Sequence, residues 1–263
     1  MTKSRILATT VLLYLAASQM ALAQHGLEGG TPMTFFVTSK PIGDGGNLGG
    51  LAGADSHCQA LAKNVGVSDQ TWQAYLSTQA RPGVPAVNAR DRIGTGPWYN
   101  FEGVMIARDV AHLHGDTIEL ARMGNNLTKR TGLTEKGQIV PGLNDYKHPE
   151  DDVWAHVQTT PYSNRHEILT GSQLDGLAYP PDADYTCDNW TSSRDPEGGA
   201  RGGPGMGMGM PLGPNRPNAQ IGFPDRNGGG DGSWNSSHGT RGCSQTALSM
   251  THGTGKLYCF AID

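Results

Sequence analysis

The sequence predicts an α+β domain whose short strands and helices are joined by long loops. Three observations support this class: a β-rich run near the start of the chain, an amphipathic helical pattern after it, and a β-rich run at 256–262 (KLYCFAI). The 263 residues include 38 glycines and 16 prolines, which favours loops over regular structure. The glycines follow no Gly-X-Y period and only 17% of residues are charged, which excludes collagen and a highly charged disordered chain.

Residues 1–23 have the pattern of a secretory signal peptide. Lys3 and Arg5 precede an apolar stretch at 6–17, and an Ala-Leu-Ala triplet supplies a small-x-small cleavage site. The apolar stretch is shorter than a membrane-spanning helix, and the alternative is an uncleaved anchor. We therefore expect a secreted or periplasmic protein with no membrane insertion after cleavage.

The mature chain is expected to start with a linker at 24–33, followed by one domain at 34–263. The domain begins with a strand at 34–39 (TFFVTS) and a glycine-rich turn region at 43–53. A helix ending at Gly66 comes next, because apolar residues at spacings of four, three, one and three share one face: Ala54, Cys58, Leu61, Ala62 and Val65. A strand at 71–77 (TWQAYLS) follows.

The middle of the chain gives weaker patterns. A strand or short helix is expected within 103–113, and segments next to the core at 168–171 and 186–190. Residues 194–232 are crowded with Gly, Pro, Asn and Met, and they lack apolar periodicity. We interpret 194–232 as a long mobile loop inside the domain, because the chain must return to add its last strand to the core.

The chain contains four cysteines: Cys58, Cys187, Cys243 and Cys259. An even number in an exported chain favours two disulfides, and no pair has the close CxxC spacing of a zinc ribbon. Four cysteines permit three pairings, and composition does not choose among them. A nested pairing, Cys58 with Cys259 and Cys187 with Cys243, would tie the two ends of the domain together.

Several motifs occur in a fixed order between residues 34 and 262: His57-Cys58-Gln59-Ala60, Trp72-Gln73-Ala74-Tyr75-Leu76-Ser77, Pro85-Ala86-Val87-Asn88, Arg90-Asp91, Trp98, Leu169-Thr170-Gly171-Ser172, Cys187 with Trp190, and Leu257-Tyr258-Cys259. This order resembles the C-type-lectin-like fold in its collagenase NC10/endostatin-like branch. It is also similar to small exported bacterial lectin-like proteins. The resemblance implies long irregular loops and the nested disulfides Cys58–Cys259 and Cys187–Cys243, and it indicates a fold rather than a ligand.

The resemblance suggests calcium-dependent sugar binding, which in this fold uses a Glu-Pro-Asn or Gln-Pro-Asp loop and a Trp-Asn-Asp segment. Trp234-Asn235-Ser236 resembles the second motif, with a serine in place of the carboxylate. Arg216-Pro217-Asn218 and Phe223-Pro224-Asp225 resemble the first in part, with Arg or Phe where a side-chain oxygen is needed. The alternative is that Trp234 packs on the core while its two neighbours serve turns.

We therefore expect a non-catalytic binding module that recognises carbohydrate or another cell-surface ligand. Six candidate residues lie in or near the long-loop region, three aromatic rings for stacking and three polar side chains for hydrogen bonds: Trp234, Trp190, Tyr185, Asn235, Asp225 and Asn218. The net charge of −4 and the scattered Lys and Arg residues argue against nucleic acid as a partner.

An exported zinc- or copper-binding protein is the alternative. His112 and His114 form an HxH pair followed by Asp116, and in a strand residues i and i+2 point the same way, so both imidazoles would meet one ion. Three methionines at 206–210 alternate with glycine, and thioethers bind Cu(I). The opposing interpretations are two surface histidines without a metal and a flexible loop that contains methionine by chance.

The sequence has no G-x-S-x-G elbow, P-loop or HExxH motif, which argues against an enzyme. Acidic clusters at 150–152 and at Asp182 and Asp184 leave an envelope polysaccharide hydrolase as a third hypothesis, against solvated loops. Arg165-His166-Glu167 forms either a polar cluster at a binding face or a structural hydrogen-bond network, and we favour the network.

Overall fold

A computed structural model of the chain describes residues 32–142, 145, 164–197, 216–228 and 232–263. One compact unit begins at Met33, whose side chain is buried, so the domain starts inside the stretch predicted as a linker. The predicted signal peptide, the acidic cluster at 150–152 and the methionine run at 206–210 lie outside the described residues.

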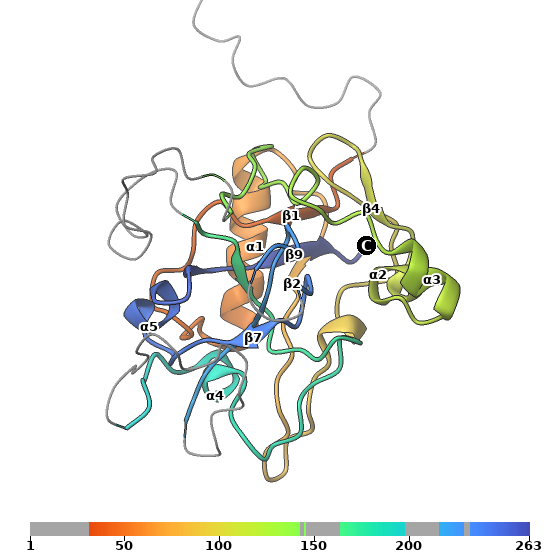
Figure 1. Ribbon diagram of the computed structural model, residues 1–263. Helices are drawn as coiled ribbons and strands as arrows, with labels where there is room; N and C mark the ends of the chain where they lie inside the picture. The colour runs from red at the N-terminus through yellow and green to blue at the C-terminus, as the bar shows by residue number, and fades with distance from the viewer. Residues whose placement is uncertain (1–31, 143–144, 146–163, 198–215, 229–231) are drawn as a thin grey trace, which may run out of the picture. The chain divides into compact units, whose positions relative to one another are not determined.

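A three-stranded antiparallel sheet joins the beginning of the domain to its end (Figure 1). Strand β9 (Tyr258–Ala261) lies between β1 (Phe35–Val37) and β2 (Trp72–Ala74) and pairs with both. Phe36 and Ala74 lie opposite Cys259 on its two sides. The three strands that the sequence predicts most clearly are therefore confirmed, each in a shorter form.

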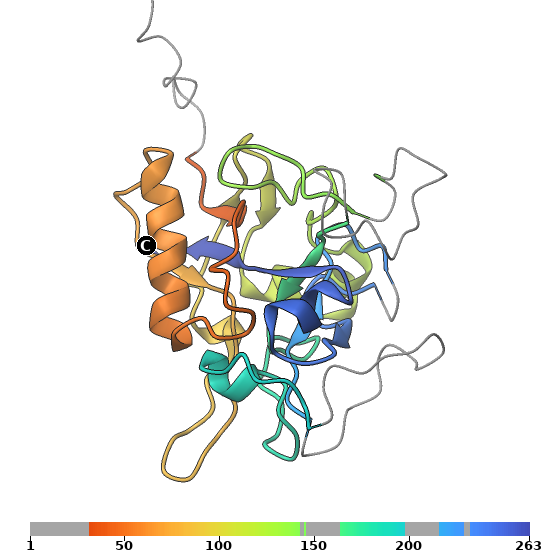
Figure 2. The ribbon, with the colours of Figure 1, turned by 90° about the vertical axis from the view of Figure 1, so that its left-hand side faces the viewer.

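Helix α1 (Gly50–Asn64) covers one face of this sheet, as the side view in Figure 2 shows. The predicted helical face is confirmed, because Ala54, Cys58, Leu61 and Ala62 are buried. The helix begins earlier than predicted, inside the glycine-rich turn region. The Cys58–Cys259 disulfide, with Cα atoms 5.7 Å apart, fastens this helix to the central strand.

Residues that alternate along these strands belong to two separate apolar clusters, because successive side chains point to opposite faces of a sheet. On the side of α1, Phe36 and Trp72 pack with Cys58. On the other side, Phe35 and Phe260 pack with Trp98. The second cluster reaches the face on which the candidate site lies.

The second sheet has the strand order β7-β6-β5-β8. It is formed by β5 (Glu167–Leu169), β6 (Gln220–Gly222), β7 (His238–Gly239) and β8 (Gly253–Lys256), with β5 and β8 parallel and the other pairs antiparallel. The segment expected at 168–171 is thus an interior strand of this sheet.

The prediction that 194–232 is one long loop is wrong for its described part. Strand β6 lies inside that range, and Ile221 and Phe223 are almost fully buried. Gly222 lets the backbone approach closely, because a Cβ there would lie 2.0 Å from the carbonyl oxygen of Trp234. A strand of three residues is too short to produce a periodic signal. The composition of the surrounding residues, rich in glycine and proline, therefore predicted a loop.

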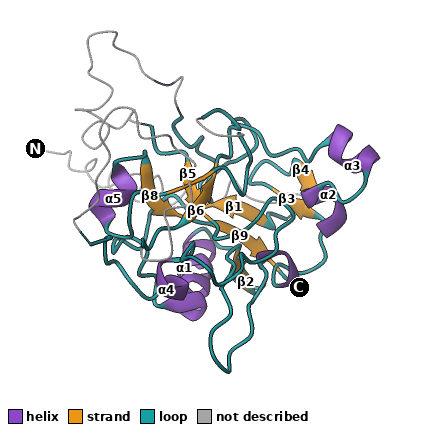
Figure 3. Ribbon diagram, turned by 60° about the horizontal axis from the view of Figure 1, so that its bottom comes forward, coloured by secondary structure: helices purple, strands orange, loops and turns teal. Residues whose placement is uncertain are grey.

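The segment 103–113 contains both expected elements in succession, a strand and a helix. Strand β4 (Met105–Ala107) pairs with β3 (Trp98–Tyr99), and α2 (Val110–His114) and α3 (Ile118–Met123) follow. Figure 3 shows α2 and α3 on the side of the domain opposite α5 (Gln245–Ser249). A short 3₁₀ turn over Ala89–Asp91 completes the first half of the domain.

The segment expected at 186–190 is α4 (Cys187–Trp190), a turn of left-handed backbone. All four residues have positive φ, from 49° to 67°, a conformation that costs non-glycine residues about 1–2 kcal/mol each. The Cys187–Cys243 disulfide and the buried Trp190 hold this turn in place. Both disulfides implied by the resemblance are therefore formed, within an α+β domain.

Candidate ligand-binding pocket

A pocket of about 390 Å³ lies where the α2–α3 segment meets residues 232–235. One wall comes from residues 113–115 of α2 and its C-terminal turn, together with parts of 120–125. Leu174, Arg226 and the segment 232–235 supply the rest. The walls are therefore contributed by segments more than 100 residues apart in the sequence.

Trp234 lines the pocket and is only 4% exposed. Its ring lies 4.9 Å from that of Tyr75 and 5.5 Å from that of Tyr258, between ring centroids. The Tyr258 hydroxyl also donates a hydrogen bond to the Trp234 carbonyl oxygen at 2.8 Å. These contacts fix both the backbone and the ring of Trp234 against the second apolar cluster.

His114 lies at the C-terminal end of α2, with both ring nitrogens engaged. Nδ1 donates to the carbonyl oxygen of Val110 at 2.9 Å, so Nε2 accepts the hydrogen bond from the Tyr75 hydroxyl at 2.8 Å. Burial lowers the pKa of His114 to about 4, and the positive charge of Arg90 adds to this effect. The imidazole that faces the pocket is therefore uncharged at neutral pH.

The Asn235 amide is directed into the protein rather than towards solvent. Its Nδ2 donates to the Tyr75 hydroxyl at 2.9 Å and to the carbonyl oxygens of Gln173 and Leu174, both at 3.1 Å. Its Oδ1 accepts a hydrogen bond from the Ser233 hydroxyl at 2.9 Å. Asn235 therefore positions the pocket wall, and it is 1% exposed.

Arg226 is the charged residue among those that line the described pocket. Its Nε donates to the carbonyl oxygen of Leu127 at 2.9 Å, and its Nη2 donates to Asn125 Oδ1 at 2.5 Å. Its backbone is left-handed, with φ of 52°. Burial lowers the pKa of the guanidinium, which stays charged at neutral pH because arginine loses its proton only in strongly basic solution.

The pocket brings together three residues that the sequence singled out in separate hypotheses. Trp234 and Asn235 come from the predicted sugar-binding set, and His114 comes from the predicted metal set. Sequence reasoning missed Arg226, which lies in the range taken for a loop. It also missed the role of Tyr75, whose strand was predicted but whose hydroxyl partner lies 39 residues away.

The other predicted sugar-binding residues do not line this pocket. Trp190 is fully buried, and its Nε1 donates to the Ser77 carbonyl oxygen at 2.7 Å. Asn218 is 1% exposed, and the Asp225 carboxylate accepts a hydrogen bond from His166 Nδ1 at 2.9 Å. Tyr185 is partly exposed and stacks on another tyrosine ring at 4.2 Å, so its face is already covered on one side.

The geometry predicted for the HxH pair is wrong, because residues 112 and 114 lie in a helix and not in a strand. Successive residues in an α-helix are rotated by about 100°, so i and i+2 point in nearly opposite directions. His112 accepts a hydrogen bond from the Arg108 N–H and donates to the Gly124 carbonyl oxygen, while Asp116 pairs with Arg90. No group of three His, Cys, Asp or Glu residues in the described part of the chain is placed to hold a metal ion.

The second acidic cluster, Asp182 and Asp184, lines a second pocket of about 260 Å³ that shares no residue with the first. Asp184 accepts the backbone N–H groups of Thr186 and Asp188, both at 2.9 Å. Asp188 in turn pairs with Arg81 at the surface. Asp184 therefore serves to hold the turn that leads into α4.

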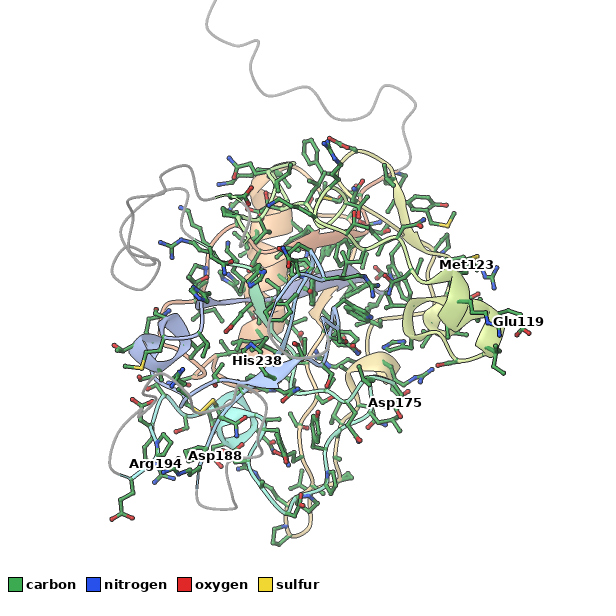
Figure 4. All side chains as sticks on the ribbon, in the orientation of Figure 1. Glu119, Met123, Asp175, Asp188, Arg194 and His238 are labelled. Carbon is green, nitrogen blue, oxygen red and sulfur yellow. A yellow bond between two sulfur atoms is a disulfide. The ribbon has the colours of Figure 1, made fainter. Side chains whose placement is uncertain are left out.

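The Arg165-His166-Glu167 segment leads into β5 and supplies buried polar groups. Glu167 is 1% exposed, accepts a hydrogen bond from the Thr251 hydroxyl at 2.8 Å, and lies 3.3 Å from His238 Nε2. Figure 4 places His238 on the second sheet, away from α3. The His166–Asp225 pair, at 2.9 Å, is a further buried polar contact of this segment.

Comparison with known proteins identifies no relative: no family model matches the chain, and no curated protein is similar to it. In the part of the chain that the structure describes, no helix is long and apolar enough to cross a membrane. All four cysteines are paired, which is compatible with an exported protein. The pocket is therefore the feature of the molecule from which a function can be inferred.

Proposed function

We propose that this protein is a secreted or periplasmic, C-type-lectin-like binding module that holds a carbohydrate in the pocket formed by His114, Trp234 and Arg226. The observation that carries the proposal is the composition of this pocket. An aromatic ring, an uncharged imidazole and a guanidinium meet there from three separate segments. Small-molecule sites of proteins typically combine an apolar or aromatic lining with a few fixed polar groups.

The volume of the pocket also favours a small ligand. About 390 Å³ lies at the lower end of the range for small-molecule sites, which is roughly 300–1,000 Å³. A space of this size accommodates one or two sugar rings rather than a folded partner. The ligand is therefore expected to be a monosaccharide or disaccharide unit of a larger glycan or a free sugar.

The lining favours binding over glycoside hydrolysis. Glycosidases of the common type place two carboxylic groups about 5–10 Å apart across the scissile bond. Among the described residues that line this pocket there is no Asp or Glu. The hydrogen bonds of His114 to Val110 and Tyr75 also keep its imidazole from acting as a free base.

The test places a large side chain across the mouth of the pocket. Leu174 lines the pocket and is 59% exposed, so Leu174→Trp fills it without disturbing the core. Leu177→Trp is the matched control, because Leu177 is 38% exposed in the same loop but does not line the pocket. Binding to a glycan array, with and without calcium, is then followed by titration of the sugars that bind.

We expect the wild-type protein and Leu177→Trp to bind the same sugars, and Leu174→Trp to lose them. The proposal is wrong if no glycan binds the wild-type protein under either condition. It is also wrong if Leu174→Trp binds as tightly as the control, because the ligand would then lie elsewhere.

A further inference from the structure

The guanidinium of Arg226 has donors left over after its internal hydrogen bonds are made. An arginine side chain carries five N–H donors. Two of them are used by the Leu127 carbonyl oxygen and by Asn125 Oδ1. Within the described residues, no partner is found for the remaining three, which include both N–H groups of Nη1.

The charge of Arg226 also lacks a counter-ion. Four arginines of the described regions form ion pairs, among them Arg90 with Asp116 and Arg92 with Asp55, at 2.5 and 2.7 Å. Arg226 has no such pair within the described residues, and the residue is exposed, so its guanidinium is accessible to a ligand. An anionic ligand in the pocket would supply the counter-ion that the described residues do not provide.

The anchoring of Arg226 holds the guanidinium ready for such a ligand. Asn125 is itself fixed, because its Nδ2 donates to the Leu113 carbonyl oxygen at 2.6 Å. The Nε side of the guanidinium therefore faces fixed acceptors, and the Nη1–Nη2 end is the edge left for a ligand. Two parallel N–H donors of this kind match the two oxygens of a carboxylate.

We propose that the pocket selects sugars that carry a carboxylate, that is uronic acids, and that Arg226 binds the carboxylate end-on through Nη1 and Nη2. This inference rests on the proposed function, since it names the class of sugar that the same pocket takes. His114 is uncharged, so the guanidinium supplies the positive charge among the described lining residues. Discrimination between an acidic sugar and its neutral counterpart therefore depends on this one side chain.

The overall charge of the chain limits the ligand to a sparsely charged one. The chain has 24 acidic and 20 basic residues, a net charge of −4, so a dense polyanion is repelled at long range. A single carboxylate that enters the pocket meets the local charge of Arg226 instead. We therefore expect a uronic acid unit, and not a highly sulfated polymer.

The experiment compares matched sugars on the full-length mature protein. The probes are D-glucuronate and D-galacturonate, their methyl esters, and the neutral sugars glucose and galactose, each titrated while the NMR signals of the labelled protein are recorded. We expect each uronate to bind about 10- to 100-fold more tightly than its ester or neutral counterpart, as is typical of a hydrogen bond to a charged group. This comparison needs only the wild-type protein.

The variants assign the preference to one residue. Arg226→Gln is expected to remove it, and Arg226→Lys to reduce it, because an ammonium keeps the charge but loses the planar pair of donors. Arg194→Gln is the control, since Arg194 is exposed and lies on the side of the domain away from α3 in Figure 4. Thermal unfolding of each variant confirms that the domain is folded.

The possible results separate this inference from the proposed function. If neutral sugars bind as tightly as uronates and Leu174→Trp abolishes both, the pocket binds carbohydrate and the inference is wrong. If Arg226→Gln keeps the preference for uronates, or Arg194→Gln loses it, the inference is also wrong. If neither class of sugar shifts the signals of the pocket, both proposals fail.

Discussion

Acid is expected to destabilise this protein through His114, the imidazole that faces the pocket. Burial lowers the pKa of His114 from 6.5 to about 4 in the folded protein. Between these values the unfolded chain binds a proton that the folded protein does not bind. The stability contributed by His114 is therefore present above pH 6.5 and is lost as the pH falls towards 4.

The size of this effect follows from the two pKa values. With a pKa of 6.5 in the unfolded chain and about 4 in the folded protein, the free energy of unfolding falls by about 2 kcal/mol between pH 7 and pH 5. His252 contributes in the same direction, because burial also lowers its pKa to about 4. The effect of His114 must therefore be isolated with a variant.

His114→Gln removes the titrating group and keeps an acceptor for the Tyr75 hydroxyl. Urea unfolding at pH 7 and pH 5 measures the free energy of unfolding of both proteins. We expect the wild-type protein to lose about 2 kcal/mol more than the variant between these pH values. His57→Gln, on the partly exposed side of α1, is the control for the loss of a histidine. Equal losses in the wild-type protein and His114→Gln would refute the reasoning.

Two further changes test the packing. Gly171 has φ of 61°, and a Cβ there would lie 2.6 Å from Cζ2 of Trp190, whereas Gly66 has φ of 83° with open space around it. Gly171→Ala is therefore expected to cost about 1–3 kcal/mol more than Gly66→Ala in urea unfolding, and equal costs would contradict this. Replacing Cys58 and Cys259 with alanine opens a loop of 201 residues and is expected to lower stability by up to about 5 kcal/mol, so an unchanged urea midpoint would speak against a structural role.

The ends of the domain could be predicted from the sequence because their signals are local and long enough. Helix α1 spans 15 residues, so its apolar face repeats several times and can be read directly. The terminal strand is a run of β-branched, aromatic and aliphatic residues with no competing pattern. Strand β6 has three residues and lies in a glycine-rich sequence. Its regular structure depends on long-range packing, so no local pattern in the sequence indicates it.

The helix that carries His112 and His114 was misread, although its boundaries are marked in the sequence. Asp109 caps the N-terminus, where its side chain accepts the His112 N–H at 2.7 Å. Gly115 ends the helix with φ of 71°, as glycine commonly does. An Asp five residues before a His and a Gly directly after it therefore favour a helical turn, and in that turn the two imidazoles diverge.

Arg226 and Tyr75 could not be assigned to the pocket from the sequence, because their partners lie far along the chain. Arg226 is held by Asn125 and Leu127, 101 and 99 residues away. Tyr75 joins His114 to Asn235, which is 160 residues away from it. No periodicity or spacing encodes such contacts, since they are set by how the two sheets pack.

The same long-range contacts make the pocket rigid before a ligand arrives. His114 is held by Tyr75, Asn235 by the backbone at 173–174, and Arg226 by the segment at 125–127. Each polar group at the pocket is thus fixed by a neighbour from a different part of the chain. Binding then orders few additional side chains, each of which would otherwise cost about 0.5–1.5 kcal/mol. A domain rich in glycine and loops can in this way present a preorganised site.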